Sequence, residues 1–100
     1  MSKTVKVPDI RELEKVVVPI LKSSDVVKAG FFGSFVRGEA TKKSDLDILI
    51  EFRGRKSLFD LSHLELELED KLGRKVDVVT YNSLNHLLKD RILREEVRIL

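Results

Sequence analysis

Residues 45–52 read DLDILIEF and place two aspartates at the start of a segment that otherwise has the pattern of a buried β-strand. Side chains alternate between the two faces of a strand. One face of this segment is therefore entirely apolar and consists of Leu46, Ile48, Ile50 and Phe52. The other face carries Asp45 and Asp47, whose like charges repel each other unless a positive charge lies between them. The strand must bury one face in a core and hold a charged site on the other.

Helical and strand patterns alternate along the rest of the chain. Apolar residues recur at helical or strand spacing in seven segments, and polar or glycine-containing turns separate these segments. The sequence predicts strands over residues 26–32, 46–52 and 75–80, and helices over residues 10–21, 35–40, 57–72 and 83–100. The order α-β-α-β-α-β-α, without repeats or linkers, predicts a single α/β (α+β) domain over residues 1–100.

Single residues indicate where several helices should begin and end. Asp9 and Ser34 are expected to cap the first two helices, because their side-chain oxygens can accept hydrogen bonds from free backbone amides. Gly73 is expected to end the third helix. Pro19 should kink or shorten the last turn of the first helix, because proline lacks an amide donor and crowds the preceding carbonyl.

A third aspartate, Asp77, lies between two valines in the last predicted strand. If the second and third strands are neighbours, Asp77 joins Asp45 and Asp47 in a cluster that could hold two divalent ions about 3.5–4 Å apart. Carboxylate oxygens favour a hard cation such as Mg²⁺. The alternatives for the single residues are a strand-entry cap at Asp45 and an ion pair between Asp77 and either Lys75 or Arg74.

Gly33 and Ser34 form a turn between the first strand and the second helix. A glycine there lets the backbone approach a ligand closely, and free amides at a helix start favour phosphate. The sequence has no G-x-x-x-x-G-K-[ST] phosphate loop. Arg37, on the short helix, either faces the phosphates or is an ordinary surface residue. The combination of this turn with the two aspartates therefore indicates a site for a metal-bound phosphate compound.

The composition excludes several classes of site. The chain has no cysteine, which excludes a disulfide scaffold, a thiolate zinc site and a cysteine nucleophile. A net charge of +2, with scattered basic residues, argues against direct nucleic-acid binding. The longest apolar run, residues 16–21, is far shorter than the roughly 20 residues that cross a bilayer, and no signal-peptide pattern begins the chain. We therefore expect a cytoplasmic protein that has no membrane partner.

Three segments together resemble a known family. They read FGSFVRGEATKKSDLDILIEF, KVDVVT and ILREEVRIL. The chain is similar to the minimal nucleotidyltransferases of the DNA polymerase-β-like nucleotidyltransferase superfamily. The resemblance covers nearly the whole chain and implies the polymerase-β-like fold, a small mixed β-sheet packed by helices. It also implies transfer of a nucleoside monophosphate, usually from ATP, to an acceptor hydroxyl with release of pyrophosphate.

The resemblance assigns roles to individual residues. Gly33 and Ser34 match the residues that hold the triphosphate. Asp45 and Asp47 match the ligands of Mg²⁺, of which two ions are expected. Asp77 matches the residue that completes the metal site and helps to activate the hydroxyl.

The resemblance also implies a partner. Minimal nucleotidyltransferases are often antitoxins of HEPN/MNT toxin–antitoxin pairs, in which they transfer AMP to a tyrosine of a HEPN-domain ribonuclease. We therefore expect a hetero-oligomer with a HEPN toxin, in which the partner supplies part of the acceptor surface. Two alternatives remain open: an antitoxin that masks its toxin sterically without catalysis, and a nucleotidyltransferase with an RNA or small-molecule acceptor.

Overall fold

A computed structural model describes residues 7–100 of the chain. The elements follow the order α1 (Ile10–Ser23), β1 (Val26–Phe32), α2 (Ser34–Arg37), β2 (Leu46–Phe52), α3 (Leu58–Leu72), β3 (Val76–Thr80), the 3₁₀ helix η1 (Tyr81–Ser83), α4 (His86–Glu95) and β4 (Val97–Arg98). The predicted α/β class is confirmed, and so are the three strands and the first three helices. The last predicted helix, over residues 83–100, differs from the observed structure.

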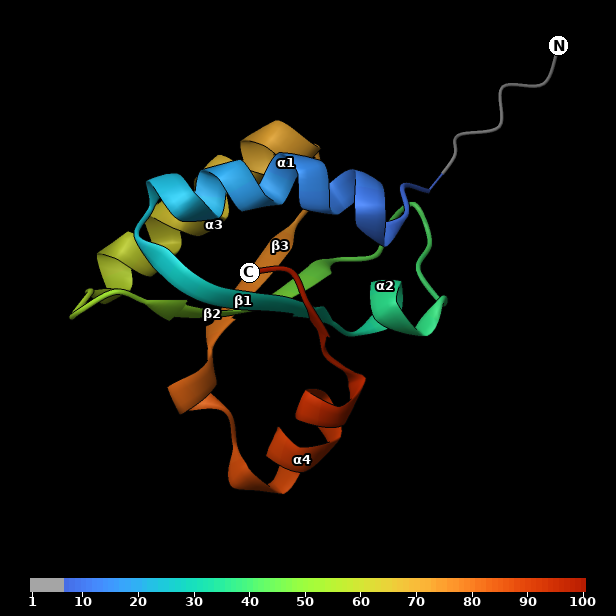
Figure 1. Cartoon of the computed structure of the whole chain (residues 1–100). Helices are drawn as coiled ribbons and strands as arrows, with labels where there is room; N and C mark the ends of the chain where they lie inside the picture. The colour runs from blue at the N-terminus through green and yellow to red at the C-terminus, as the bar shows by residue number, and fades with distance from the viewer. Residues whose placement is uncertain (1–6) are drawn as a thin grey trace, which may run out of the picture.

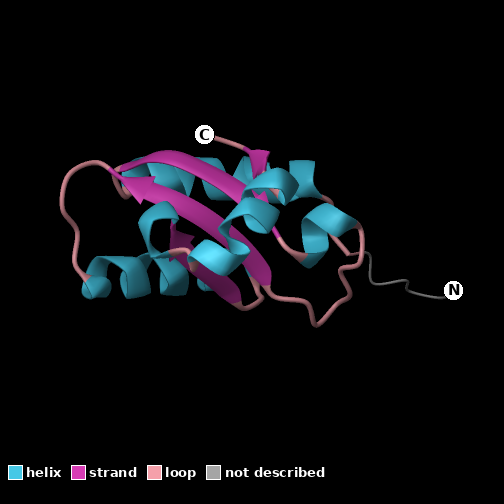
Figure 2. Ribbon diagram, turned by 90° about the horizontal axis from the view of Figure 1, so that it is seen from below, coloured by secondary structure: helices cyan, strands magenta, loops and turns pink. Residues whose placement is uncertain are grey.

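The strands form one mixed sheet in the order β3-β2-β1-β4. β1 pairs antiparallel with both β2 and β4, whereas β2 pairs parallel with β3. Helices α1 and α3 cover one face of this sheet, and α4 lies on the opposite side (Figure 1). Figure 2, seen from below, shows the long strands side by side, with helices in front of them and behind them. Strands β2 and β3 are therefore neighbours, as the predicted cluster of aspartates requires.

The core lies between the sheet and the α1–α3 layer. Leu46, Ile48 and Ile50 on the predicted apolar face of β2 are completely buried. They pack with apolar side chains of both long helices, which include Leu13, Val17, Leu21, Leu64 and Leu68. Leu49 is also completely buried although it belongs to the other face of β2, so the middle of that second face is covered as well.

Some helix ends agree with the sequence and others differ. Asp9 caps α1 through the amide of Glu12 and Gly73 ends α3, both as predicted, and Ser57 caps α3. Pro19 lies inside α1, which continues to Ser23 and is not shortened, because a proline removes only its own donor and the amides that follow it can still bond.

Helix α2 also differs from its prediction. Gly33 is the N-cap and makes no side-chain hydrogen bond, while Ser34 is the first helical residue and not the cap. The helix ends at Arg37 and not near residue 40, because Gly38 adopts a left-handed backbone conformation with φ of 74°.

The prediction of a helix from residue 83 to the end of the chain is wrong. Helix α4 stops at Glu95, and Val97–Arg98 forms the edge strand β4 against β1. Leu93 and Val97 are four residues apart and so fit a helix, but Val97, Arg98 and Ile99 also fit the alternation of a strand. The strand forms because the free backbone groups along the edge of β1 need hydrogen-bonding partners, which residues 97–98 supply.

No helix within residues 7–100 combines the length and the apolar character needed to cross a lipid bilayer.

Candidate active site

Two of the predicted aspartates are direct neighbours across the parallel strand pair. Asp47 of β2 lies in register with Asp77 of β3. Asp45 comes two residues before Asp47, immediately ahead of the strand, so its charge adds to theirs. No ion pair joins Asp77 to Lys75 or Arg74 among the residues that the structure describes. The sheet therefore gathers three carboxylates at one end without neutralising them.

The pKa of Asp47 is raised by its burial and by the neighbouring carboxylates. Burial raises the pKa of the Asp47 carboxyl to about 6, and the charges of Asp77 and Asp45 add to the increase. The positive charge of Arg37 acts in the opposite direction but is outweighed. At neutral pH the cluster thus carries negative charge at an energetic cost, which a bound cation would relieve.

The donor set fits a hard divalent cation, because all of its ligands are carboxylate oxygens. Within residues 7–100, however, no three acidic or histidine side chains converge closely enough to form a complete metal cage. Mg²⁺ does not require one, since it usually takes one or two protein carboxylates together with substrate phosphates and water. Residues Asp45, Asp47 and Asp77 therefore fit Mg²⁺, whereas a two-ion site built from all three stays a prediction.

Gly33, in the turn that is predicted to bind phosphate, lies against the acid cluster. Its φ of 84° and ψ of −156° belong to a backbone region that is essentially restricted to glycine. A Cβ atom at this position would overlap Oδ2 of Asp47. The register explains this closeness, because Phe32 pairs with Asp47 and Gly33 is the next residue. Glycine is thus required both by the backbone conformation and by the neighbouring carboxylate.

Arg37 lies at the end of α2, close enough to the cluster to influence the pKa of Asp47. Its guanidinium donates from Nη1 to Oε1 of Glu95 at 2.8 Å and from Nε to Oε1 of Glu39 at 3.0 Å. Oε2 of the same Glu95 accepts from the backbone amide of Gly33 at 2.9 Å. Sequence patterns assign no role to Glu95, because it lies in a segment that they predict to be one continuous helix.

A second residue that sequence patterns missed is Arg74, between α3 and β3. Its guanidinium stacks 4.9 Å from the centre of the Phe35 ring on α2. Its Nη1 donates to the carbonyl of Ser44 at 2.9 Å, directly before Asp45. Arg74 therefore ties the phosphate-turn helix to the loop that leads into the two aspartates.

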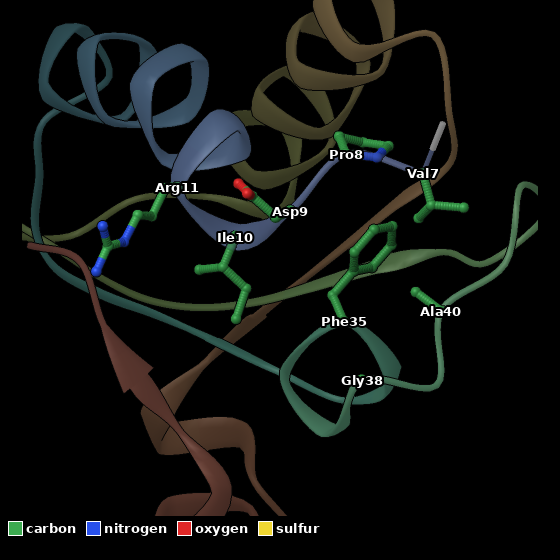
Figure 3. Close-up of a pocket in the computed structure, with 8 residues that line it drawn as sticks. All are labelled: Val7, Pro8, Asp9, Ile10, Arg11, Phe35, Gly38 and Ala40. Carbon is green, nitrogen blue, oxygen red and sulfur yellow. The ribbon is translucent and has the colours of Figure 1, made fainter. Parts of the chain in front are cut away.

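A separate pocket is lined by residues outside this site. It has a volume of about 410 Å³ and lies between the segment that enters α1 and helix α2, as Figure 3 shows. Val7, Ile10 and Phe35 contribute much of its apolar lining. None of the predicted site residues lines it, so the acid cluster does not belong to this pocket.

Comparison with protein families matches residues 10–99 to the nucleotidyltransferase domain. A relative from Methanocaldococcus jannaschii, provisionally named a protein adenylyltransferase, is 51% identical over 92 residues, which cover 92% of this chain and 99% of the relative. The protein adenylyltransferase MntA of Thermococcus cleftensis is 45% identical over 74 residues, covering 74% of this chain and 75% of that protein.

Solved structures give the same result. A structure provisionally named a minimal nucleotidyltransferase is 36% identical and has a TM-score of 0.76, with coverage of 88% of this chain and 90% of that one. The tri-AMPylated HEPN toxin of Shewanella oneidensis in complex with an MNT antitoxin contains a chain with a TM-score of 0.72. At 17% identity, over 90% of this chain and 71% of that one, this second likeness concerns the fold.

The contact between Gly33 and Asp47 leads to a stability prediction. Gly33→Ala should lower the free energy of unfolding by about 2 kcal/mol or more, because it adds backbone strain and displaces the Asp47 carboxylate. Gly54→Ala is the matched control: Gly54 also has a positive φ, of 69°, but an added Cβ would meet nothing within 4 Å. It should cost about 1 kcal/mol. Urea unfolding measures both, and equal losses would contradict the proposed contact.

The raised pKa of Asp47 predicts a pH-dependent effect of its removal. Because the folded protein binds this proton more tightly than the unfolded chain does, stability from this group is present below about pH 4 and is lost as pH rises to about 6. In metal-free buffer at pH 7.5, Asp47→Asn should therefore raise the free energy of unfolding by about 1–2 kcal/mol, after allowance for solvent screening.

Below pH 4 the same substitution should have little effect, since the carboxyl is then protonated in the folded protein. Asp70→Asn, on the exposed side of α3, is the control and should change stability little at either pH. Thermal unfolding in the presence of a chelator gives the comparison. A loss of stability for Asp47→Asn at pH 7.5 would show that the carboxylates are not in electrostatic conflict.

Proposed function

The chain belongs to the nucleotidyltransferase-domain family, and on this premise we propose that it is a protein adenylyltransferase that acts as an antitoxin in the cytoplasm. Its substrates are ATP and a tyrosine hydroxyl of a HEPN-domain ribonuclease toxin, with which it forms a hetero-oligomer. The transfer of AMP to that tyrosine silences the toxin.

The observation that carries this proposal is the register of Asp47 with Asp77, together with the packing of Gly33 against Asp47. These contacts bring a phosphate turn and a pair of carboxylates from different strands to one point. A phosphoryl transfer needs this combination, because its catalysis consists largely of positioning and charge stabilisation.

The comparisons support the choice of reaction and partner. Two relatives with 51% and 45% identity carry the name protein adenylyltransferase. The partner is supported by fold alone, through the complex of an AMPylated HEPN toxin with its MNT antitoxin. The names of the relatives support a protein as the acceptor. The tyrosine is part of the proposal, and the groups that act on ATP are proposed from the residues of this chain.

The proposed binding mode places the triphosphate of ATP on the phosphate turn. The amides of Gly33 and Ser34 donate to its phosphate oxygens, and Arg37 adds a charge-assisted hydrogen bond. Asp45 and Asp47 hold Mg²⁺, with Asp77 completing the set. When bound, Mg²⁺ supplies the positive charge that neutralises the phosphoryl oxygens as the transfer proceeds.

The proposed transfer step uses Asp77 as the general base. The tyrosine oxygen forms a bond to the α-phosphorus of ATP, and the bond from that phosphorus to the bridging oxygen breaks. Pyrophosphate leaves with the electron pair of the broken bond. The proton of the hydroxyl passes to a carboxylate oxygen of Asp77, so that the products are AMP-tyrosine and pyrophosphate.

The proposal predicts the activity of a variant at Asp77. Asp77→Asn should lower the rate of AMP transfer by about 10²–10⁴-fold, because the amide cannot accept the proton. Purified protein, a HEPN-domain partner, Mg²⁺ and ATP labelled at the α-phosphate give the measurement, and mass spectrometry locates the label. Asp70→Asn, at an exposed carboxylate on α3 to which the proposal gives no role, is the matched control and should retain full activity.

The outcome separates the proposal from its alternatives. Absence of label on the toxin at every Mg²⁺ concentration, with the toxin nevertheless neutralised, would indicate steric masking. In that case the double variant Asp45→Asn with Asp47→Asn would still protect against the toxin. Label on an RNA or a small molecule instead would retain the transferase and overturn the acceptor.

A further inference from the structure

The carboxylate of Glu95 occupies the two groups that the proposed function assigns to the triphosphate. Its Oε2 accepts from the Gly33 amide at 2.9 Å, and its Oε1 accepts from Nη1 of Arg37 at 2.8 Å. The Glu95 side chain is only 15% exposed, compared with 38% for that of Arg37. One internal anion therefore bridges the phosphate turn and the arginine.

The backbone amide of Gly33 cannot bind Glu95 and a phosphate at the same time. A backbone amide has one hydrogen to donate, so it cannot serve both acceptors in good geometry. A carboxylate and a phosphate are also interchangeable partners for a guanidinium, because both accept charge-assisted hydrogen bonds from it. The carboxylate oxygens of Glu95 therefore take the positions that phosphate oxygens of the substrate would take in the proposed binding mode.

The fold holds the backbone of Glu95 beside the site. β4 begins two residues later and pairs with β1, while the neighbouring Glu96 accepts a hydrogen bond from the Tyr81 hydroxyl. Helix α4, by contrast, has no buried residue. Because the anchor lies after Glu95 and the helix before it is loosely packed, the carboxylate can rotate away while the strand pairing stays intact.

We propose that Glu95 is an affinity-determining residue of the nucleotide site, whose carboxylate competes with the triphosphate for the Gly33 amide and Arg37 and leaves them when ATP binds. This inference rests on the proposed function. In the proposed free state, the Glu95 carboxylate keeps the Gly33 amide and Arg37 in position. ATP then has to displace this carboxylate in order to bind.

The sign of a substitution distinguishes competition from a purely supporting role. If Glu95 only held Arg37 and the turn in place, its removal would weaken nucleotide binding. If it competes, its removal strengthens binding. Glu95→Gln keeps the shape of the side chain and removes its charge, and Glu95→Ala removes the contact altogether.

Isothermal titration with Mg²⁺ and a non-hydrolysable ATP analogue tests the proposal, with inorganic tripolyphosphate as a second probe. Both Glu95 variants should bind both probes about five- to tenfold more tightly than the wild type, a gain limited by the partial exposure of the ion pair. Asp90→Asn on the exposed surface of α4 changes the net charge equally and should leave the Kd unchanged. Circular dichroism verifies that every variant is folded.

A double-mutant cycle with Arg37→Gln adds a second criterion. The gain from Glu95→Gln should shrink in the Arg37→Gln background, because one of the two contested groups is then missing. Equal or weaker binding by both Glu95 variants would overturn the role of Glu95 and leave the proposed function standing. Failure of the wild type and all variants to bind either probe would overturn both.

Discussion

The parallel pairing of β2 with β3 is the constraint on which the rest of the site depends. It places Asp47 beside Asp77, and the antiparallel pairing on the other side of β2 brings Gly33 against Asp47. The register is fixed by the core, because a shift by one residue would turn the buried face of Leu46, Ile48 and Ile50 toward the solvent side of the sheet. Hydrophobic burial on one face of β2 thus determines where the carboxylates on its other face meet.

Much of this arrangement could be predicted from local patterns. The two-residue period of β2 is sufficient to separate its apolar face from its acidic face, and the glycine between β1 and α2 marks the turn that we propose binds phosphate. The pairing of β2 with β3 could not be read from either strand, since it depends on contacts between distant segments. The contact of Glu95 with Gly33 could not be predicted for the same reason, because the two residues are 62 positions apart in the sequence. In addition, the helix that contains Glu95 was predicted to continue through the residues of β4.

The carboxylates of the candidate site repel one another, a conflict that a bound cation would relieve. Burial and two neighbouring carboxylates raise the pKa of Asp47 to about 6, so the like charges of the cluster repel one another at neutral pH. The nearby cation Arg37 is already engaged by Glu95 and Glu39. A metal–triphosphate complex would complement both features, because its cation would meet the carboxylates while its phosphates would meet the amide and the guanidinium. Such local conflict, tolerated by a well-packed core, is typical of functional sites.

The most direct measurement is an NMR titration of ¹⁵N-labelled protein with Mg²⁺ and a non-hydrolysable ATP analogue. We predict that the largest amide shift changes occur at Gly33, Ser34, Asp47 and Asp77, on three different elements that meet only in the folded sheet. Changes confined to the pocket around Phe35 and the start of α1, or no changes at millimolar analogue, would contradict the assignment of the nucleotide site to this end of the sheet.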